Sequence, residues 1–261
     1  MHLLPLVSES LHLLWPARCA ACDRQVPEDA LFCAPCNLAI NPMPMASVGV
    51  CPGCALPFEV APRDVMSDGN RCRRCRRVPL PFISAAAGFE YGETMAEAIV
   101  RMKHGGRRDL AQRLARLLVP AVAEALAQGR IGSTDIVVPV PLHASKLRER
   151  GFNQALELAR WALIGLARAP RLRPSGGLPR LERNLLHRTR ATRELGRSGP
   201  GARLAEVAGA FVVSDTARVR GRRVLLIDDV YTTGATFSEC SNALLAAGVT
   251  AVHALALARA V

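Results

Sequence analysis

A short stretch near the C-terminus places the strongest constraint on the fold of this 261-residue chain. Val224 to Ile227 is a run of apolar, mostly branched residues, which is typical of a buried strand. The run ends in two adjacent carboxylates, Asp228 and Asp229, and a helical pattern that continues to Gly248 begins after a short turn. Strand, acidic pair, turn and helix in this order predict an α/β protein with a ligand site at the end of a strand.

The turn and the acidic pair suit two different ends of one ligand. The turn runs from Thr232 to Thr236, and Gly234 within it lets the backbone approach an anion closely. A helix N-terminus adds unpaired N–H groups and a partial positive charge. Carboxylates repel phosphate, but they accept hydrogen bonds from sugar hydroxyls or approach a hydrated Mg²⁺. The stretch therefore predicts a ribose 5-phosphate site; an ordinary turn with a solvated charge pair is the alternative.

Eight of the nine cysteines form four C-x-x-C pairs, all before residue 76. The pairs are Cys19 and Cys22, Cys33 and Cys36, Cys51 and Cys54, and Cys72 and Cys75. Two such pairs complete one tetrahedral Zn²⁺ site, so the chain is expected to bind two structural zinc ions. Sequential pairing is the simplest arrangement, and a cross-braced one stays open. Disulfides are disfavoured because the N-terminus lacks the basic leader of an export signal, and a redox motif normally occurs once. Cys240 is expected in the core.

The charge of the chain is carried almost entirely by arginine. The formal net charge is +12, and Lys103 and Lys146 are its only lysines, either because these positions need a compact ammonium or by chance. Excess arginine suits phosphorylated metabolites or nucleic acid. Five arginines between residues 71 and 77 form a basic tip that either contacts nucleic acid or balances the thiolates. No run of about 18 apolar residues occurs, so we expect a cytoplasmic protein without membrane insertion.

Proline residues near position 80 mark an expected boundary between a Cys-rich module (1–78) and a larger domain (79–261). In the larger domain, helical and strand patterns alternate, which predicts a mainly parallel sheet with helices on both faces. The segment 168–203 carries ten arginines among Pro, Gly and Ser and is expected to be an exposed, mobile insertion. The predicted elements are an extended segment 82–91, a helix from a capping box at Thr94 to about Lys103, helices 109–128 and 152–166, and strands 135–138, 211–213, 224–227 and 249–257.

A second group of residues follows strand 135–138 and is expected at the same sheet edge as the acidic pair. It combines a proline-containing loop with three cations, which could hold a second, pyrophosphate-like anion; a solvated charge run at a helix start is the alternative. The residues are Pro139, Val140, Pro141, Leu142, Lys146, Arg148 and Arg150.

Two resemblances sharpen these expectations. The 228–236 stretch resembles the phosphoribosyl pyrophosphate (PRPP) motif of type I phosphoribosyltransferases, which implies that the acidic pair holds the ribose hydroxyls and the loop the 5′-phosphate. The residues so implicated are Asp228, Asp229, Val230, Tyr231, Thr232, Thr233, Gly234, Ala235 and Thr236. The four cysteine pairs, residues 102–105, 138–154 and 188–192 and the acidic motif together resemble the competence protein F family over residues 15–259. Glu194 and Glu206 depart from that family's pattern.

The family resemblance implies a zinc-ribbon module joined to a type I phosphoribosyltransferase-like domain, with a link to DNA uptake in natural transformation. An enzyme would bind PRPP and Mg²⁺ and transfer the pentosyl group to an acceptor that the sequence does not identify, and no catalytic residue can be assigned. The alternative is a competence factor that handles single-stranded DNA, together with other competence proteins, and keeps the PRPP site as a sensor or relic. A purely structural zinc adaptor ranks last because it leaves the Asp228 motif unexplained.

Overall fold

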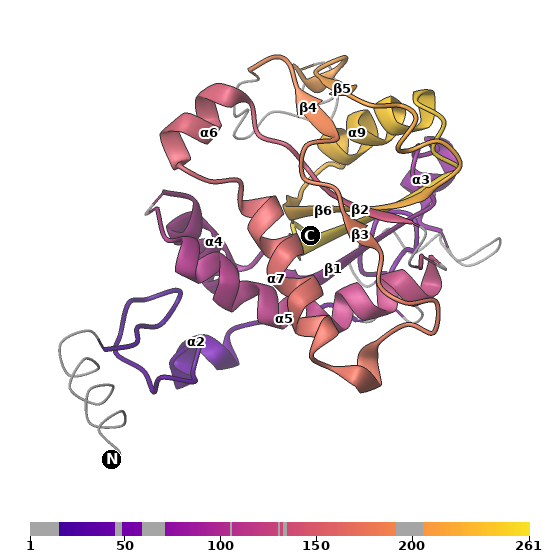
Figure 1. The fold of residues 1–261 in the computed structure, drawn as a ribbon. Coiled ribbons are helices and arrows are strands. Elements are labelled where there is room, and N and C mark those ends of the chain that lie inside the picture. The colour runs from indigo at the N-terminus through magenta and orange to yellow at the C-terminus, as the bar shows by residue number, and fades with distance from the viewer. Residues whose placement is uncertain are drawn as a thin grey trace.

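A five-stranded sheet, parallel at every pairing, lies at the centre of the molecule (Figure 1). The structure is a computed structural model, and it describes residues 16–44, 49–58, 71–104, 106–129, 131–132, 135–191 and 206–261. The strand order is β1-β7-β6-β2-β3. The strands are β1 (Ser84–Glu90), β2 (Ile136–Pro139), β3 (Arg180–Leu181), β6 (Arg223–Tyr231) and β7 (Ala251–Arg259).

Helices cover both faces of this sheet. On one face α5 packs against α7, α4, β1 and β7, and α7 contacts β2 and β6; on the other face α9 packs against β7 and β5. The helices are α2 (Ala34–Leu38), α3 (Arg73–Arg77), α4 (Glu93–His104), α5 (Arg108–Gln128), α6 (Ala144–Arg150), α7 (Gln154–Ala167), the 3₁₀ turn η1 (Pro170–Leu172) and α9 (Ala235–Ala246). The predicted fold class, a mainly parallel α/β sheet with helices on both faces and a Cys-rich ribbon module, is confirmed.

The alternation of side chains along β6 distributes them between the two large hydrophobic clusters of the core. Leu225 and Ile227 join a cluster with α4, α5 and α7, whereas Val224 and Leu226 join a second cluster with α9. Such a period of two is what a strand with both faces covered requires. The fully apolar run 224–227 therefore predicted the strand because neither of its faces is exposed to water.

Each cluster also takes in one half of the Cys-rich module. Cys19, Ala20 and Phe32 belong to the cluster of α4 and α5, and Cys51 and Cys75 belong to the cluster of α9. We call residues 16–44 the first ribbon and residues 49–58 with 71–78 the second ribbon. Both hydrophobic clusters thus extend across residue 78, and the domain boundary there stays a prediction.

Several predicted elements need correction. Strand β6 does not end at Ile227 but continues through both aspartates to Tyr231. Helix α4 begins at Glu93, and Ala96 N–H donates to the Gly92 carbonyl, so Thr94 lies in the first turn instead of capping it. The predicted strand 211–213 exists as β5 (Phe211–Val213) but pairs antiparallel with β4 (Leu186–Arg188), outside the central sheet.

The described part of the arginine-rich segment is not a mobile insertion. It contains β3 at the sheet edge and β4 in the small sheet, and Leu185 and Leu186 are buried. The apolar residues between the arginines supply the burial that fixes this part of the chain. Residues 192–203 of the prediction, with Glu194, lie outside the described residues. No helix among the described residues combines the length and the apolarity needed to span a bilayer.

Candidate functional site

The acidic pair lies at the C-terminal end of β6, and its two carboxylates face opposite sides of the sheet. Asp229 contacts α4, where its Oδ2 lies 2.9 Å from the Lys103 Nζ atom. Asp228 faces the side of α9, as does Leu226 two residues before it on β6, and its charge acts on Cys240 of α9 and on Arg188. The Oδ1 atom of Asp228 also accepts a hydrogen bond of 2.8 Å from Asp229 N–H. One acid is therefore presented on each side of the strand end.

Lys103 is a site residue that the sequence marked in two ways, as one of two lysines and within the stretch 102–105 of the family resemblance, without giving it a partner. Its side chain is 22% exposed and that of Asp229 is 5% exposed, so the ion pair is largely withdrawn from water. Burial alone would lower the pKa of Lys103, but the neighbouring carboxylates of Asp229 and Asp228 outweigh it and raise that pKa. Lys103 therefore stays charged and balances one of the two acids.

Asp228 is the acid with the altered titration. Burial, and then the nearby charge of Asp229, raise the pKa of Asp228 from 3.8 to about 7, although Lys103 and Arg188 act in the opposite direction. Burial in turn lowers the pKa of Arg188, whose guanidinium lies 5.4 Å from the Phe211 ring centre. A carboxyl group with a pKa near neutrality readily changes charge when a cation or a sugar hydroxyl arrives.

Arg188 is a functional candidate that periodicity could not find. It lies on β4, in the segment predicted to be mobile, and β4 reaches the site because His143 and Arg188 form a parallel bridge. The available signal was the R-x-R-x-T stretch at 188–192, which the family resemblance marked without giving it a place in the fold.

The predicted phosphate loop, Thr232 to Thr236, follows directly on β6 and is shorter than expected, because α9 already begins at Ala235. Gly234 has a φ of +85° and forms the N-cap of this 12-residue helix. Before it, Thr232 is exposed and Thr233 is partly exposed, and the Thr233 Oγ1 atom accepts a hydrogen bond of 3.4 Å from Ala235 N–H in the first turn. The loop thus provides a helix N-terminus with hydroxyl groups beside it, as the sequence predicted.

Gly234 has a second reason to be glycine. A Cβ atom there would lie 2.9 Å from Cε2 and 3.0 Å from the hydroxyl oxygen of Tyr231. The Tyr231 ring is buried in an edge-to-face cluster with Phe82 and Phe237, with centroid distances of 6.3 and 5.4 Å. The glycine therefore serves the packing of the turn as well as any approach to an anion.

The loop after β2 reaches the same sheet edge but serves mainly to connect helices. Val140 N–H donates to Ile227 O, and the Asn153 side chain donates to Val140 O while its Oδ1 caps α7. Gly151, with a φ of +78°, ends α6, and Phe152 is buried. The R-G-F-N-Q stretch is therefore explained by a helix end, a buried anchor and a helix cap.

The three cations predicted to hold pyrophosphate lie on α6 and are not equivalent. Arg150 donates to the Gln154 Oε1 atom at 2.8 Å, and its charge acts on Lys103, which places it near the acidic pair. Lys146 lies 3.3 Å from Glu149 of the same helix, and Arg148 is exposed. Arg150 is thus the one of the three whose charge acts on Lys103, the partner of Asp229.

The eight paired cysteines gather into two clusters by sequential pairing, each with all sulfur atoms within 4.8 Å of one another. Both clusters have the same construction. A turn between short bridged segments supplies the first pair, with a positive φ at Asp23 or Ala55, and the N-terminus of α2 or α3 supplies the second. The ninth cysteine, Cys240, is fully buried, as predicted.

The donor geometry fits zinc. The Cys22–Cys33 and Cys54–Cys72 sulfur atoms are 3.6 Å apart, close to the edge of about 3.8 Å expected for a tetrahedron with Zn–S bonds of about 2.3 Å. Without a cation, burial and the neighbouring sulfurs raise the pKa of Cys36 to about 12. Four thiolates cannot coexist so closely unless a cation binds them.

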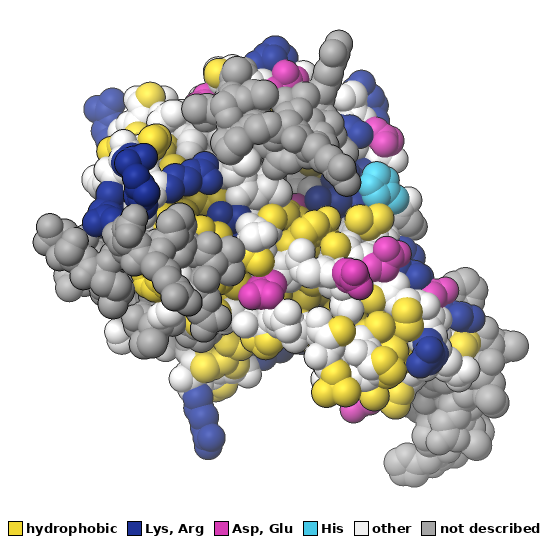
Figure 2. Space-filling model, turned by 180° about the vertical axis from the view of Figure 1, so that it is seen from behind, with side chains coloured by type: hydrophobic (Ala, Val, Ile, Leu, Met, Phe, Trp, Pro, Cys, Tyr) yellow, Lys and Arg dark blue, Asp and Glu magenta, His cyan; other side chains and the backbone are white. Residues whose placement is uncertain are grey.

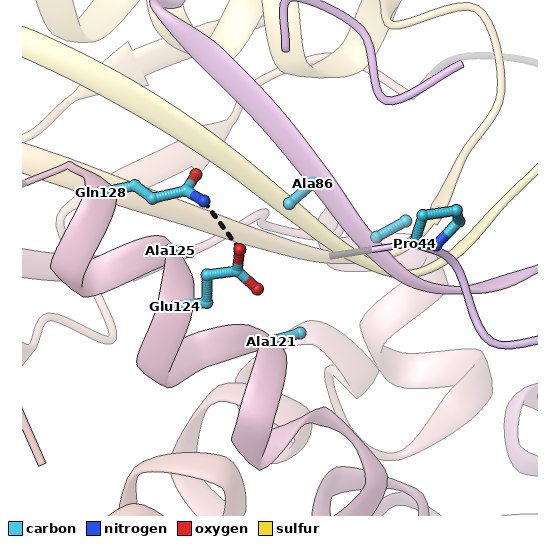
Figure 3. A pocket seen from close by; sticks show the side chains of 7 residues that line it. Pro44, Ala86, Ala121, Glu124, Ala125 and Gln128 are labelled. Atoms are coloured by element: carbon cyan, nitrogen blue, oxygen red, sulfur yellow. Dashed lines mark hydrogen bonds between the residues drawn. The ribbon is translucent and has the colours of Figure 1, made fainter. Parts of the chain in front are cut away.

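Two hollows lie outside the acidic site. A small cavity between α5 and β1 is lined by Pro44, Ala86, Ala87, Ala121, Glu124, Ala125 and Gln128, and its volume of about 10 Å³ suits a single water molecule (Figure 3). A larger open hollow of about 440 Å³ lies at α3 and is lined by Leu56, Cys72, Arg73, Arg74, Arg77 and Val78. In the rear view, Lys and Arg side chains gather on the side where α3 lies (Figure 2).

Comparison with known proteins agrees with this architecture. Residues 10–76 match the model of the double zinc ribbon domain. The DNA utilization protein YhgH of Escherichia coli K12 is 28% identical over 214 residues, which cover 80% of this chain and 84% of that protein. Competence protein F of Haemophilus influenzae is 27% identical over 227 residues, or 83% of this chain and 93% of that protein. The chain is a homologue of these proteins. The predicted relationship to the competence protein F family is thereby confirmed.

Solved structures were also matched. A hypoxanthine phosphoribosyltransferase from Staphylococcus aureus is 12% identical with a TM-score of 0.33; the match covers 55% of this chain and 61% of that enzyme. A hypoxanthine-guanine phosphoribosyltransferase from Leishmania donovani is 14% identical with the same TM-score of 0.33, covering 56% of this chain and 66% of that enzyme.

Proposed function

We propose that this chain binds PRPP with Mg²⁺ at the C-terminal end of β6. The observation that carries the proposal is the strand end itself, where two acids are followed by a left-handed Gly234 and the N-terminus of α9. Asp228, which is partly exposed, would accept hydrogen bonds from the ribose hydroxyls, and Asp229 would support the site from the other side of the strand end by holding Lys103. Thr232 to Thr236 would bind the 5′-phosphate through backbone N–H and hydroxyl groups.

The pyrophosphate would lie on the side of the acidic pair away from the phosphate loop, close to several cations. Lys103 and Arg188 act electrostatically on Asp228, and Arg150 acts on Lys103. Lys146 and Arg148 add further positive charge along α6. Mg²⁺ binds proteins through one or two carboxylates and otherwise through water and substrate phosphates. Asp228, which is partly exposed, suits that role better than Asp229, which is already paired.

If the chain is a transferase, the reaction is pentosyl transfer. The bond between C1 of the ribose and the pyrophosphate oxygen breaks with its electron pair on pyrophosphate, and a bond from C1 to the acceptor nucleophile forms. The protein would contribute the orientation of the sugar and the neutralisation of the leaving group, since positioning and electrostatics dominate such displacements. The acceptor stays unassigned.

Calorimetry with PRPP and Mg²⁺ tests this function. We expect saturable heat from the zinc-loaded protein, a weaker signal when Mg²⁺ is omitted, and losses of about 1–3 kcal/mol of binding free energy for Asp228→Asn and Asp229→Asn. Glu124→Gln is the matched control, because Glu124 lines the small cavity away from the acidic pair. An absence of heat and of any thermal shift at millimolar PRPP would reject the site.

A second function, binding of single-stranded DNA, is favoured by the surface of α3. Arg73, Arg76 and Arg77 are exposed there, and the neighbouring hollow has Leu56 and Val78 in its lining. Cations that follow the phosphate backbone supply the electrostatic part of a single-strand site. A role beside other competence proteins is consistent with the names of the homologues. A reducing cytoplasm would preserve the zinc thiolates.

Fluorescence anisotropy with a labelled single strand at several salt concentrations tests the second function. We expect affinity to fall steeply with salt, and the slope to decrease by up to about three when Arg73, Arg76 and Arg77 are all changed to glutamine. The control changes Arg168, Arg171 and Arg173 to glutamine, which removes the same charge elsewhere. Equal effects of the two triple variants would reject α3 as the site.

A further inference from the structure

The backbone just before Gly234 is hydrogen-bonded by two arginine side chains that are connected to the second ribbon. Three consecutive carbonyl groups, those of Tyr231, Thr232 and Thr233, accept hydrogen bonds from arginine side chains. Arg259 donates from Nη1 to Tyr231 O at 3.0 Å and to Thr232 O at 2.6 Å, and Arg74 donates from Nη2 to Thr233 O at 2.9 Å. Every peptide that leads into Gly234 is thus fixed by a guanidinium group.

Both arginines are tied to the second Cys₄ cluster. Arg74 lies in α3 between Cys72 and Cys75, and its position is therefore set by two of the cluster's ligands. Arg259 ends β7, and its Nε donates to the carbonyl of a third ligand, Cys54, at 3.0 Å. Its guanidinium also lies 4.3 Å from the Tyr231 ring centre and is 3% exposed as a residue, so it has little freedom to move.

The direction of these carbonyls determines the direction of the neighbouring N–H groups. In a planar trans peptide the C=O and the following N–H point in opposite directions, and no cis peptide occurs in the described chain. With the carbonyls of residues 231–233 turned toward the second ribbon, the N–H groups of Thr232, Thr233 and Gly234 point away from it. They therefore face the side on which an anion could be bound.

The first ribbon has a different place. It docks on α4 and α5, where Arg101 donates to Ala21 O and Arg113 donates to Arg18 O and Ala30 O. No described contact connects it to residues 231–235. Two metal sites of the same construction are thus attached to different parts of the sheet domain.

We propose that the second Cys₄ site is a positioning element for the anion-binding loop, acting through Arg74 and Arg259, whereas the first site has no such role. The ligand-binding half of this proposal rests on the proposed PRPP function. The conformational half does not, because it concerns the order of residues 231–238 with or without a ligand.

Arg74→Met tests the proposal without disturbing the core, because Arg74 is exposed. Hydrogen exchange followed by mass spectrometry should show about tenfold faster exchange of peptides covering residues 231–238. PRPP with Mg²⁺ should bind about tenfold more weakly, and Arg74→Lys should recover part of both losses. Arg77→Met is the matched control, since it removes the same charge from α3 and no described bond joins Arg77 to the loop.

A comparison of the two metal sites completes the test. Cys22→Ser with Cys36→Ser removes ligands of the first cluster, and Cys51→Ser with Cys72→Ser removes ligands of the second. Faster exchange in 231–238 only for the second pair supports the proposal. The proposal is overturned if the two double cysteine variants show equal exchange in residues 231–238, or if Arg74→Met leaves that exchange unchanged. Faster exchange in Arg74→Met with no PRPP binding by the unmodified protein would reject the PRPP site and leave the positioning role supported.

Discussion

Lys103 and Lys146, the two lysines of the chain, occupy opposite electrostatic situations. Lys103 pairs with a carboxylate that is almost withdrawn from water, whereas the partner of Lys146, Glu149, has a side chain that is 63% exposed. A buried ion pair is not itself strongly stabilising, but removal of one partner leaves a charge without solvent or counterion. The compact ammonium at position 103 is therefore explained by the site, and that at 146 by a surface pair.

Lys103→Met should destabilise the protein by about 3–5 kcal/mol, because the Asp229 carboxylate would lose its partner. The double variant Lys103→Met with Asp229→Asn should regain most of that loss, since the neutral amide needs no counterion. Lys146→Met is the matched control and should cost about 0–1 kcal/mol. Urea unfolding measures all three; a loss in Lys103→Met no greater than in the control would contradict the ion pair.

The raised pKa of Asp228 makes stability depend on pH. Between 3.8, its ordinary value, and about 7, its value in the folded protein, the native state holds a proton that the unfolded chain releases. Native stability contributed by this group is therefore present below about pH 4 and is lost as the pH rises to about 7.

Asp228→Asn cannot ionise, so it should be more stable than the parent at pH 8 by about 1–3 kcal/mol and nearly equal to it at pH 4. Urea unfolding of the zinc-loaded protein at both pH values gives the difference. Glu97→Gln, at an exposed position of α4, should follow the parent at both. A constant difference between Asp228→Asn and the parent across this range would refute the assignment.

At the scale of elements, the turn between β6 and α9 combines a left-handed glycine with a packed aromatic ring. Gly221 supplies a comparison within the same chain, because its φ is +74° and a Cβ there would meet nothing within 4 Å. Gly234 has a φ of +85° and the Tyr231 ring in the way. The difference in stability between alanine variants at these two positions therefore measures the steric clash with the Tyr231 ring, separately from the cost of a left-handed backbone.

Gly221→Ala should cost about 1–2 kcal/mol, the scale of the left-handed penalty. Gly234→Ala should cost about 1–3 kcal/mol more, because the Tyr231 ring is held by Phe82, Phe237 and Arg259 and cannot yield. Denaturant unfolding measures both costs from the shift in midpoint, provided that the dependence of the unfolding free energy on denaturant concentration is unchanged. Equal losses at the two positions would show that the ring does not restrict Gly234. A Gly234 variant is thus a poor probe of phosphate binding alone.

The elements that sequence predicted well are those whose signal is local. The apolar run 224–227, the C-x-x-C spacing and the small residues after Asp229 each carry their structure within about ten residues. Lys103 and Arg259 reach the site from α4 and β7, and Arg74 reaches it from the ribbon, 159 residues away from Thr233. Such contacts depend on how the elements pack, and no periodicity of one segment records them.

Strand ends were misplaced for a related reason. Hydrophobicity stops at Ile227, but the ladder with β7 continues as Asp228–Ala256 and Val230–Ala258. Charged residues can continue a strand when their side chains find partners, here Lys103 and the Asp229 N–H group. The prediction of a mobile insertion at 168–203 was wrong for a similar reason. Burial of a few leucines fixes the described part of this segment, although most of its residues are polar or charged.

At the scale of the whole molecule, the two ribbons join the hydrophobic clusters on opposite sides of one sheet, the first by packing on α4 and α5. The first contributes to the hydrophobic cluster of α4, α5 and α7, and the second to the cluster of α9. A module joined only by a linker would lose its metal without consequence for the sheet. Here the ribbons and the sheet domain share hydrophobic clusters, so loss of the metal should destabilise the sheet domain. Unfolding of the ribbons would expose apolar surface of both clusters to water.

Removal of both metal ions should therefore destabilise the sheet domain. Elemental analysis should find two zinc ions per chain before chelation. The chain has two tryptophans, so a Trp15→Phe variant makes Trp161 on α7 a reporter of the sheet domain. The thermal transition seen by Trp161 should fall by at least about 5 °C after treatment with a zinc chelator in excess Mg²⁺. Added Zn²⁺ should restore it. An unchanged Trp161 transition in zinc-free protein would show that the ribbons and the sheet fold independently, with the boundary at residue 78 that the sequence suggested.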